Sequence, residues 1–463
     1  MNKKNIEIQE NFTLGLENFR NNNLKEAKFF FNKVVEIDPN NFNAHNNLGV
    51  ILKELGDFYE AIKCYEKAIK INPKKAEAYS NLGLVLDRLG ENQRAIDLHK
   101  QSIQIDPKYT NAYYNIAVLF KKLGELQKAI YYYEEAIKIN PNDPELNFGL
   151  GTLLLTTFNF EKGFEKYEWR KKTASNINKF KDIKSLEWNG EDLTGKTILI
   201  LSEQGLGDII QFSRYIYFLD QKYSAKIIFR TKKNIIHFFS NSRFKVISDQ
   251  EKIPPHDFHK HLMSLPKIIY SKNNMFLKNV NYINKDKNIF LKWKNKLSDI
   301  KGFKVGISWQ GNKKYNFDHL RSFPLNYFEK LFSINKISFI SLQKGFGSEQ
   351  INDFKYKDKI YDFSSEMDNG SNVFEDTIGV LQNLDLVIVP DSSLAHLSAT
   401  LEIKTWMLLY FSPDWRWSLQ LKNSIWYENL NIYKQKEANN WDFVFEKLYK
   451  DLVATSINSK HNK

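Results

Sequence analysis

The chain has 463 residues, more than a single hydrophobic core usually holds, so at least two domains are expected. Apolar residues make up 42% and aromatic residues 14% of the chain, which excludes a disordered or fibrous protein. The formal charge of +13 leaves two interpretations open: an anionic partner (nucleic acid, a membrane face or a phosphate ligand), or compositional drift toward lysine.

The N-terminal residues contain no apolar run like that of a signal peptide. The longest apolar runs, such as 197–201 and 384–389, are too short to cross a bilayer. A single cysteine, Cys64, excludes an intrachain disulfide and a zinc site built from several cysteines. We therefore expect a cytoplasmic protein without a membrane span.

The first third of the chain repeats every 34 residues. Prolines, alanines and glycines recur at this interval at Pro39, Pro73, Pro107 and Pro141, at Ala27, Ala61, Ala95 and Ala129, and at Gly15, Gly49 and Gly83. Further glycines, at Gly56, Gly90 and Gly124, separate two helical patterns in the second, third and fourth periods. One helix–turn–helix unit cannot bury its own apolar face, so the units are predicted to stack into a solenoid.

This pattern resembles the tetratricopeptide repeat. The predicted units span 8–41, 42–75, 76–109 and 110–143, with a degenerate fifth copy at 144–177. In that copy Phe158 replaces the turn glycine that the second, third and fourth units have. The resemblance implies that the solenoid, residues 8–177, binds a protein partner; the alternative is a spacer or a dimer arm.

The charge changes at the end of the repeats. Residues 1–177 hold 25 basic and 23 acidic residues, a net charge of +2, whereas residues 178–463 hold 42 and 31, a net charge of +11. The excess therefore favours an anionic small ligand in the second part and argues against nucleic acid bound along the solenoid.

The second part is predicted to contain two α/β halves, at 190–285 and 303–450. Short, β-branched apolar runs indicate buried parallel strands at 197–201, 226–229, 244–247, 305–309, 337–342, 384–389 and 405–409. Helices are predicted to begin near Ile209 and Leu394. In such sheets ligands bind outside the carboxyl ends of the strands, so we expect the site there.

Glycines and an acidic residue follow the first of these strands. Gly205 and Gly207 allow backbone N–H groups to approach an anionic ligand or acceptor. Asp208 either caps the helix that follows or acts as a general base that takes a proton from an acceptor hydroxyl.

The second half offers a candidate diphosphate site. Asp391, Ser392 and Ser393 precede a predicted helix, whose N-terminus favours an anion, and His396 follows within the first turn. Further candidate donor-binding residues at neighbouring strand ends are Ser308, Gln310, Gly311, Arg321, Gln343 and Lys344. Arg321 could neutralise phosphate charge or lie on the surface.

Two further groups were considered as ligand contacts. The segment 414–417 (Asp-Trp-Arg-Trp) either packs between the halves or stacks on a ligand. His256, His259 and His261 follow two prolines, and we expect them at the surface or between domains, not on zinc. We therefore predict no metal site.

Four segments together resemble motifs of the ADP-heptose:lipopolysaccharide heptosyltransferase-like family, in the variant fused to tetratricopeptide repeats. They are Gly205-Leu-Gly-Asp208, Gly306-Ile-Ser-Trp-Gln-Gly311, Arg321-Ser-Phe-Pro324 and Asp391-Ser-Ser-Leu-Ala-His396. The resemblance implies a GT-B fold, with the acceptor on the first half and a nucleotide-sugar donor on the second. It also implies inverting sugar transfer without a metal ion or other cofactor.

The resemblance assigns roles to single residues. It implies that Asp208 is the base, that Asp391, Ser392 and His396 match the donor-side D-[ST]-x-x-x-H pattern, and that Arg321 serves the donor phosphates. The heptosyltransferases proper tend to have lysine near Arg321. They also lack a repeat domain, so the expected acceptor is a protein or a larger glycan-bearing partner.

The sequence thus predicts a glycosyltransferase whose acceptor is recruited partly by the repeats. The alternative is a non-catalytic tetratricopeptide scaffold with a decayed transferase domain. Binding of nucleic acid by the basic half is a third and weaker hypothesis.

Overall fold

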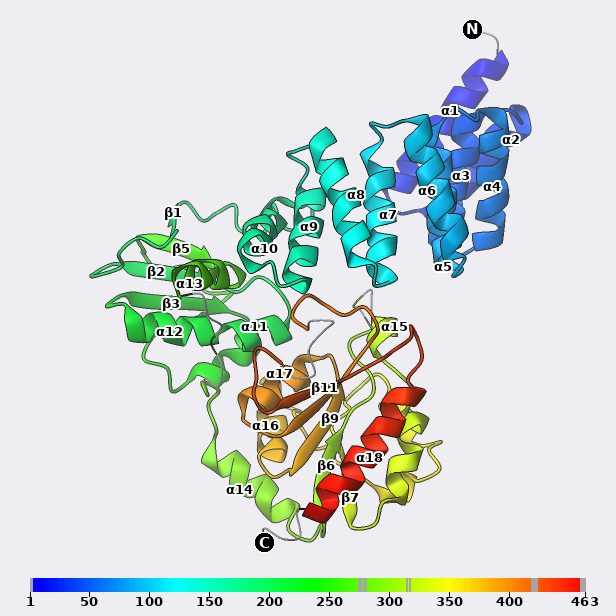
Figure 1. Cartoon of the computed structure of the whole chain (residues 1–463). Helices are drawn as coiled ribbons and strands as arrows, with labels where there is room; N and C mark the ends of the chain where they lie inside the picture. The colour runs from blue at the N-terminus through cyan, green and yellow to red at the C-terminus, as the bar shows by residue number, and fades with distance from the viewer. Residues whose placement is uncertain are drawn as a thin grey trace. The chain divides into compact units, whose positions relative to one another are not determined.

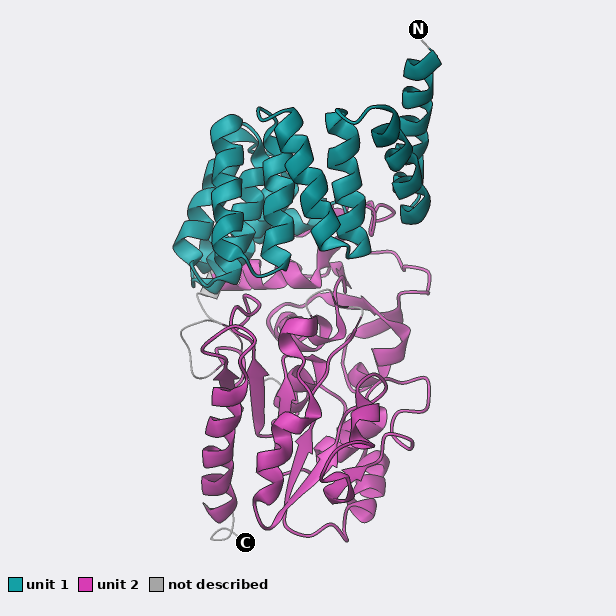
Figure 2. Cartoon of the chain, turned by 90° about the vertical axis from the view of Figure 1, so that its right-hand side faces the viewer, with its two compact units in different colours: residues 1–176 teal, residues 177–463 magenta. Residues whose placement is uncertain are grey.

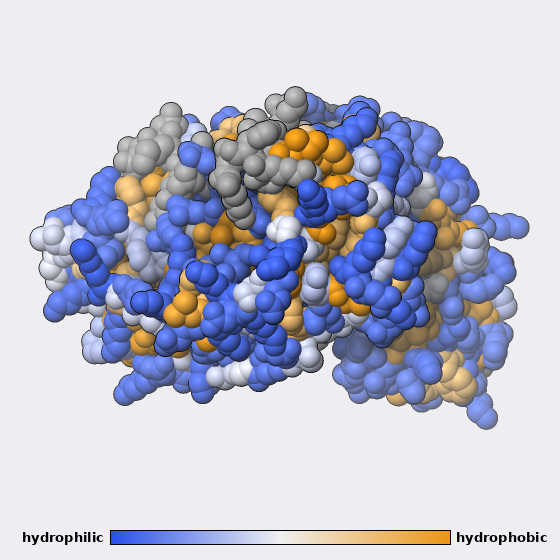
Figure 3. Space-filling view, turned by 90° about the horizontal axis from the view of Figure 1, so that it is seen from below, coloured by the Kyte–Doolittle hydropathy of each residue, from blue (hydrophilic) through white to orange (hydrophobic). Residues whose placement is uncertain are grey.

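The computed structural model describes residues 3–273, 277, 281–313, 315, 318–417 and 424–458. The chain divides into two compact units, Met1–Asn176 and Ile177–Lys463, which are coloured separately in Figure 2. No helix within the described ranges is long and apolar enough to cross a membrane. The face shown in Figure 3 is largely hydrophilic, with scattered apolar side chains.

The first unit is a succession of antiparallel helix pairs (Figure 1). The pairs are α1 (Lys3–Arg20) with α2 (Leu24–Ile37), α3 (Phe42–Leu55) with α4 (Phe58–Ile71), α5 (Ala76–Arg88) with α6 (Asn92–Ile105), α7 (Thr110–Lys122) with α8 (Leu126–Ile139), and α9 (Pro144–Thr156) with α10 (Phe160–Tyr167). A 3₁₀ turn, η1 (Glu168–Lys172), follows. The predicted helical solenoid is therefore confirmed, and the degenerate fifth copy forms a helix pair like the others.

The turns inside the pairs require a left-handed backbone. Gly56, Gly90 and Gly124 have φ of +84°, +83° and +77°, which glycine adopts without steric cost. Phe158 adopts the same region with φ of +65° in the fifth pair. A side chain in this conformation costs about 1–2 kcal/mol, so the surrounding packing must hold it there.

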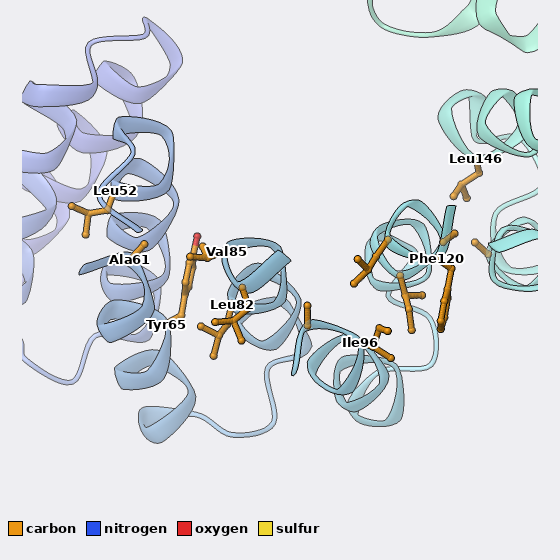
Figure 4. Close-up of a cluster of buried hydrophobic side chains, with 14 of the residues drawn as sticks. Leu52, Ala61, Tyr65, Leu82, Val85, Ile96, Phe120 and Leu146 are labelled. Atoms are coloured by element: carbon orange, nitrogen blue, oxygen red, sulfur yellow. The ribbon is translucent and has the colours of Figure 1, made fainter. Parts of the chain in front are cut away.

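Within a helix pair, an aromatic ring of the second helix packs directly on a glycine of the first helix. A Cβ atom on Gly49 would lie 2.7 Å from the Tyr65 ring, and Gly15 and Phe31 are equally close, at 2.8 Å. Only glycine permits this approach, because a Cβ at either position would push the two helices apart. Figure 4 shows the Tyr65 ring directed toward Val85 of the next pair, so the same ring joins successive repeats.

The second unit contains two parallel sheets. The first has the strand order β1-β5-β2-β3-β4, built from β1 (Leu186–Glu187), β2 (Thr197–Leu201), β3 (Lys226–Thr231), β4 (Lys245–Ser248) and β5 (Phe258–His261). Its helices are α11 (Leu206–Phe212), α12 (Arg214–Lys222) and α13 (Leu265–Asn273), with the 3₁₀ turns η2 (Lys233–Phe239) and η3 (Leu262–Ser264).

The second sheet has the order β11-β10-β9-β6-β7-β8. Its strands are β6 (Phe303–Ile307), β7 (Ile337–Ser341), β8 (Ile360–Asp362), β9 (Leu386–Pro390), β10 (Thr405–Leu409) and β11 (Leu430–Lys434), all paired in parallel. Its helices are α14 (Lys287–Lys296), α15 (Asp318–Arg321), α16 (Glu375–Leu381), α17 (Ser393–Thr400) and α18 (Asp442–Asn458), with the 3₁₀ turns η4 (Leu325–Ser333), η5 (Ser348–Ile351) and η6 (Lys357–Lys359). The second part is thus an α/β structure with parallel sheets, as predicted.

The predicted strands 197–201 and 405–409 have the observed bounds, but the strand predicted at 305–309 ends earlier, at Ile307. The backbone N–H groups of Trp309 and Gln310 both donate to Gln343 Oε1, at 3.1 Å. This side chain replaces the neighbouring strand as hydrogen-bond partner, so the chain leaves the sheet and turns outward at its carboxyl edge. Strands β1, β5, β8 and β11 are additions to the predicted set.

Candidate functional site

Each sheet of the second unit has a topological switch point, a pair of neighbouring strands from which the chain continues in opposite directions across the sheet. In the first sheet it lies between β2 and β5, and in the second between β6 and β9. The connections that follow the carboxyl ends of these two strands run away from each other, which leaves a crevice for a ligand. Asp208 lies just beyond β2, Ser308 beyond β6, and Asp391 and Ser392 beyond β9. The predicted site residues thus cluster at these two points.

Asp208 lies in the first turn of α11 and contacts both halves of the unit. Its Oδ2 accepts a hydrogen bond from the N–H of Gly205, at 2.9 Å, so the predicted capping role is present. Its Oδ1 pairs with Nη2 of Arg416, which belongs to the second half. Burial raises the pKa of the Asp208 carboxyl, and the Arg416 charge opposes that rise. Capping and a role as a base are therefore compatible.

Gly207 lets the two halves touch beside Asp208. Helix α11 packs against α17, and a Cβ on Gly207 would lie 3.0 Å from Cδ2 of His396 and 3.7 Å from Cα of Ser393. The predicted acceptor loop and the predicted donor helix are therefore in direct contact. The close approach needs a residue without a side chain at position 207.

The donor-side loop is held in place by its backbone and by one carboxylate. The backbone oxygen of Asp391 accepts from Nη1 of Arg321 at 2.8 Å, and Asp391 Oδ1 accepts from Nε1 of Trp417 at 2.9 Å. Burial, together with the Asp414 charge, raises the pKa of Asp391 to about 6. These contacts hold the donor-side loop in place without using the Ser392 hydroxyl.

Three buried polar atoms at this edge have no protein partner within the described part of the chain: Ser308 Oγ, Ser392 Oγ and Gln310 Oε1. Buried polar groups without a hydrogen bond are uncommon, because each costs about 1–3 kcal/mol. Ser308 and Ser392 follow adjacent strands of the second sheet. These atoms are available to a water molecule or a polar ligand at this edge.

His396 is buried in α17 and held by two aromatic side chains. Its Nδ1 lies 3.1 Å from the Tyr427 hydroxyl, and its ring stacks on Trp417 with centroids 5.2 Å apart. Burial, and then the charges of Arg416 and Arg214, hold the pKa of His396 well below its ordinary value. The ring is therefore neutral near pH 7 and can donate or accept one hydrogen bond toward a ligand.

Arg321 and Gly311 belong to one arrangement. Nε of Arg321 donates to Asp318 Oδ1 at 2.8 Å, and the guanidinium lies 4.6 Å from the centre of the Tyr315 ring. A Cβ on Gly311 would lie 2.2 Å from that Asp318 oxygen and 2.7 Å from Nη2 of Arg321, so glycine is required there. Arg321 is partly buried at the edge of the donor loop, and its predicted contact with the donor phosphates stays a prediction.

Gln343 and Lys344 have internal partners. Besides accepting from two backbone N–H groups, Gln343 donates through Nε2 to the oxygen of Phe346 at 2.8 Å. Nζ of Lys344 contacts the backbone oxygens of Met367 and Asp368 and lies 3.0 Å from Asn369 Oδ1. Both side chains shape loops at the carboxyl edge, and their predicted contact with the donor stays a prediction.

A pocket of about 380 Å³ opens beside this edge. It is lined by Gln310, Lys313, Tyr315, Asp318, His319, Ser322, Phe323, Pro324 and Phe346. Aromatic rings and polar side chains of both charges surround it, a mixture suited to a planar, polar ligand group.

Sequence reasoning missed Arg214 and did not place Arg416 or Tyr427 at the site. Arg214 is buried, and its Nη1 donates to the backbone oxygens of Leu277 and Trp426, at 2.8 and 2.6 Å. Its guanidinium lies 4.4 Å from the centre of the Tyr427 ring. The 414–417 segment was recognised as unusual, and its packing alternative agrees with Trp415, which lies against Phe212 of α11.

Of the three histidines near residue 256, His261 is the last residue of β5, beside Leu201 of β2, and its ring packs on Phe180. His256 Nδ1 lies 2.8 Å from the Pro254 oxygen, and His259 Nδ1 lies 3.0 Å from Ser185 Oγ. The described residues contain no group of three or more His, Cys, Asp and Glu that could hold a metal ion.

Comparisons with known proteins cover the first unit best. Models of the tetratricopeptide repeat match residues 11–41, 41–108 and 110–143. The chain is 26% identical over 313 residues to Protein FlbA of Caulobacter vibrioides (strain ATCC 19089 / CIP 103742 / CB 15), a match that covers 63% of this chain and 52% of FlbA. The chain therefore spans about half the length of this relative.

Solved structures with some similarity include a crystal structure of MamA and the pilF protein of Pseudomonas aeruginosa. MamA is 28% identical, with 35% of this chain and 98% of MamA covered and a TM-score of 0.31. The pilF protein is 17% identical, with 48% and 88% covered and a TM-score of 0.37. From the family models, residues 11–143 consist of tetratricopeptide repeats.

Proposed function

We propose that the protein is a glycosyltransferase that moves a sugar from a nucleotide-sugar donor to a protein or glycan acceptor, which the repeats help to recruit. One observation carries the proposal. Asp208, the candidate base, lies in the helix that packs directly on α17, whose N-terminus carries Asp391, Ser392 and His396. A base on one side and an anion-binding helix terminus on the other are what sugar transfer from a diphosphate needs.

The proposed reaction is a single displacement with inversion at the sugar carbon. Asp208 accepts the proton of an acceptor hydroxyl, and the acceptor oxygen forms the new bond to that carbon. The bond between the carbon and the diphosphate oxygen breaks, and its electron pair leaves with the nucleoside diphosphate.

The negative charge that develops on the leaving group is stabilised by groups of the second half. These are the first-turn N–H groups of α17, the hydroxyls of Ser308 and Ser392, and the guanidinium of Arg321. A GT-B arrangement, a cytoplasmic location and a reaction without a metal ion belong to this proposal. The repeats support the recruitment of a protein partner, because stacked helix pairs of this kind present extended binding surfaces.

The test is a thermal-shift screen of nucleoside diphosphates and nucleotide sugars on the full chain. It is followed by mass spectrometry of acceptors in cell extract treated with the donor that binds. We expect a rise in melting temperature with one nucleoside diphosphate and a sugar-sized mass increase on an acceptor. Neither binding nor transfer with the whole panel would support the non-catalytic scaffold instead.

A further inference from the structure

We propose that Arg416 is a second basic residue for the donor diphosphate, and that the diphosphate and Asp208 compete for its guanidinium. In the empty site Arg416 pairs with Asp208. In the loaded site it contacts phosphate oxygens, and Asp208 is released to accept the acceptor proton. The proposal rests on the transferase function proposed above and adds to it a coupling between donor binding and the base.

Arg416 links the two halves through carboxylates. Its Nη2 contacts Asp208 Oδ1 from α11, and its Nη1 contacts Asp414 Oδ1 at 2.5 Å. The Arg416 side chain is 10% exposed and that of Asp208 is 19% exposed. Such a pair is screened little by water and is stronger than a pair on the surface. The pair therefore holds Asp208 in place and favours its ionised form against the effect of burial, but it also occupies the carboxylate.

Arg416 is within reach of the donor site. The next residue, Trp417, donates to Asp391 and stacks on His396. The partner of Arg416, Asp208, follows Gly207, which packs on His396 and Ser393 at the start of α17. Burial has the largest effect on the pKa of Asp391 and of His396, and the positive charge of Arg416 lowers both. An anion bound at Ser392 would lie in the same field.

The backbone of Arg416 is fixed, so only its side chain has to move. The backbone oxygen accepts from Nε1 of Trp426 at 2.9 Å, and the backbone N–H donates to Asp414 Oδ1 at 3.1 Å. The guanidinium lies 4.9 Å from the centre of the Trp415 ring and 5.6 Å from that of Phe212. Contacts with aromatic rings do not use the N–H groups of a guanidinium, so these remain able to bind an anion.

The competition has a chemical consequence. A carboxylate paired with a guanidinium is a weak base, because the pair favours its ionised form. A diphosphate carries more negative charge than one carboxylate and offers several oxygens to a guanidinium, so it is the better partner. Base activation would then follow donor binding, and the same Arg416 would stabilise the leaving group as the bond to the sugar breaks.

The first experiment measures binding of nucleoside diphosphates and of the matching nucleosides to the full chain by titration calorimetry. The variants are Arg416→Gln, Arg416→Lys and, as the control, Lys330→Gln, which removes a positive charge from an exposed pair with Glu446. We expect Arg416→Gln to weaken diphosphate binding about tenfold or more and to change nucleoside binding less than about twofold. Arg416→Lys should restore part of the loss, and Lys330→Gln should change neither affinity.

An equal loss of affinity for the diphosphate and the nucleoside in Arg416→Gln, or no loss of affinity for either, would overturn the role of Arg416. Circular dichroism shows whether each variant is folded. If Arg416→Gln does not fold, the comparison of Arg416→Lys with the wild type still tests the proposal. If the wild-type chain binds no nucleoside diphosphate at all, the proposed function itself fails. Wild-type binding that is indifferent to Arg416 removes only this inference.

The second experiment is a crystal structure of the full chain with the bound nucleoside diphosphate. We expect guanidinium nitrogens of Arg416 within hydrogen-bond distance of phosphate oxygens and separated from the Asp208 carboxylate. An intact pair between Arg416 and Asp208 in that complex would overturn the competition.

Discussion

His99 makes the stability of the solenoid sensitive to acid. Its ring lies on Gly83, at the repeat position that Phe31, Tyr65 and Tyr133 occupy in the neighbouring pairs. The ring is 1% exposed, and burial lowers its pKa to about 4, although the charge of Asp87 opposes this. Because the unfolded chain binds a proton near the ordinary pKa of about 6.5, the folded state resists protonation that the unfolded state accepts.

The magnitude follows from the two pKa values. Stability is unaffected by His99 above about pH 6.5, and it falls as the pH drops from there toward about 4. Between about pH 7.5 and pH 5 the loss is about 2 kcal/mol, and near pH 4 it approaches about 3 kcal/mol. Replacing His99 by phenylalanine removes this contribution. The hydroxyl of Ser80, which lies 3.3 Å from His99 Nδ1, keeps its hydrogen bond from Asn115.

The assay is hydrogen exchange of peptides from α5 and α6 in a series of urea concentrations, at both pH values, for the wild type and His99→Phe. Because the other titrating groups are the same in both proteins, their contributions cancel when the change in stability of His99→Phe is subtracted from that of the wild type. We expect the wild type to lose about 2 kcal/mol more than His99→Phe on acidification. An equal loss in both proteins would refute the reasoning that the buried, neutral ring is the cause.

Two further predictions concern the second unit. Gly311→Ala places a methyl group 2.2 Å from Asp318 Oδ1 and should destabilise the unit by about 2–4 kcal/mol in calorimetric melting. As the control, Gly370→Ala places its methyl group in open space and should stay within about 1 kcal/mol of the wild type. Equal melting temperatures of the two variants would contradict this prediction. Trp417→Phe removes the hydrogen bond from Trp417 Nε1 to Asp391 Oδ1, which helps to hold the donor-side loop, and should weaken nucleoside diphosphate binding about threefold or more by calorimetry. Unchanged affinity would show that the contact does not orient this loop.

The repeats could be predicted from the sequence because each unit is local. A 34-residue period, turn glycines such as Gly90 and small residues such as Gly49 all act within one or two neighbouring helices. The strand ends could be predicted for a similar reason. A buried parallel strand is a short apolar run, and the polar residues that follow it, such as Asp208 and Asp391, must lie at one edge of the sheet.

The pairing of Arg416 with Asp208 could not be predicted in this way. The two residues are 208 positions apart, and their contact depends on how two sheets pack against each other. Arg214 gave no signal in the sequence, because a buried arginine that binds backbone oxygens looks like any surface arginine in a helical pattern. The contacts of Lys344 with three oxygens could not be predicted either, because its partners, residues 367–369, lie in a loop that follows the next strand along the chain.

The central claim is that Asp208 is the base of a sugar transfer from a nucleotide-linked donor. The most direct test compares transfer by the wild type and Asp208→Asn, measured by mass spectrometry of the acceptor with the donor found by the binding screen. We expect the variant to lose transfer by about a hundredfold or more while it still binds the nucleoside diphosphate. Transfer by Asp208→Asn at the wild-type rate would contradict the claim.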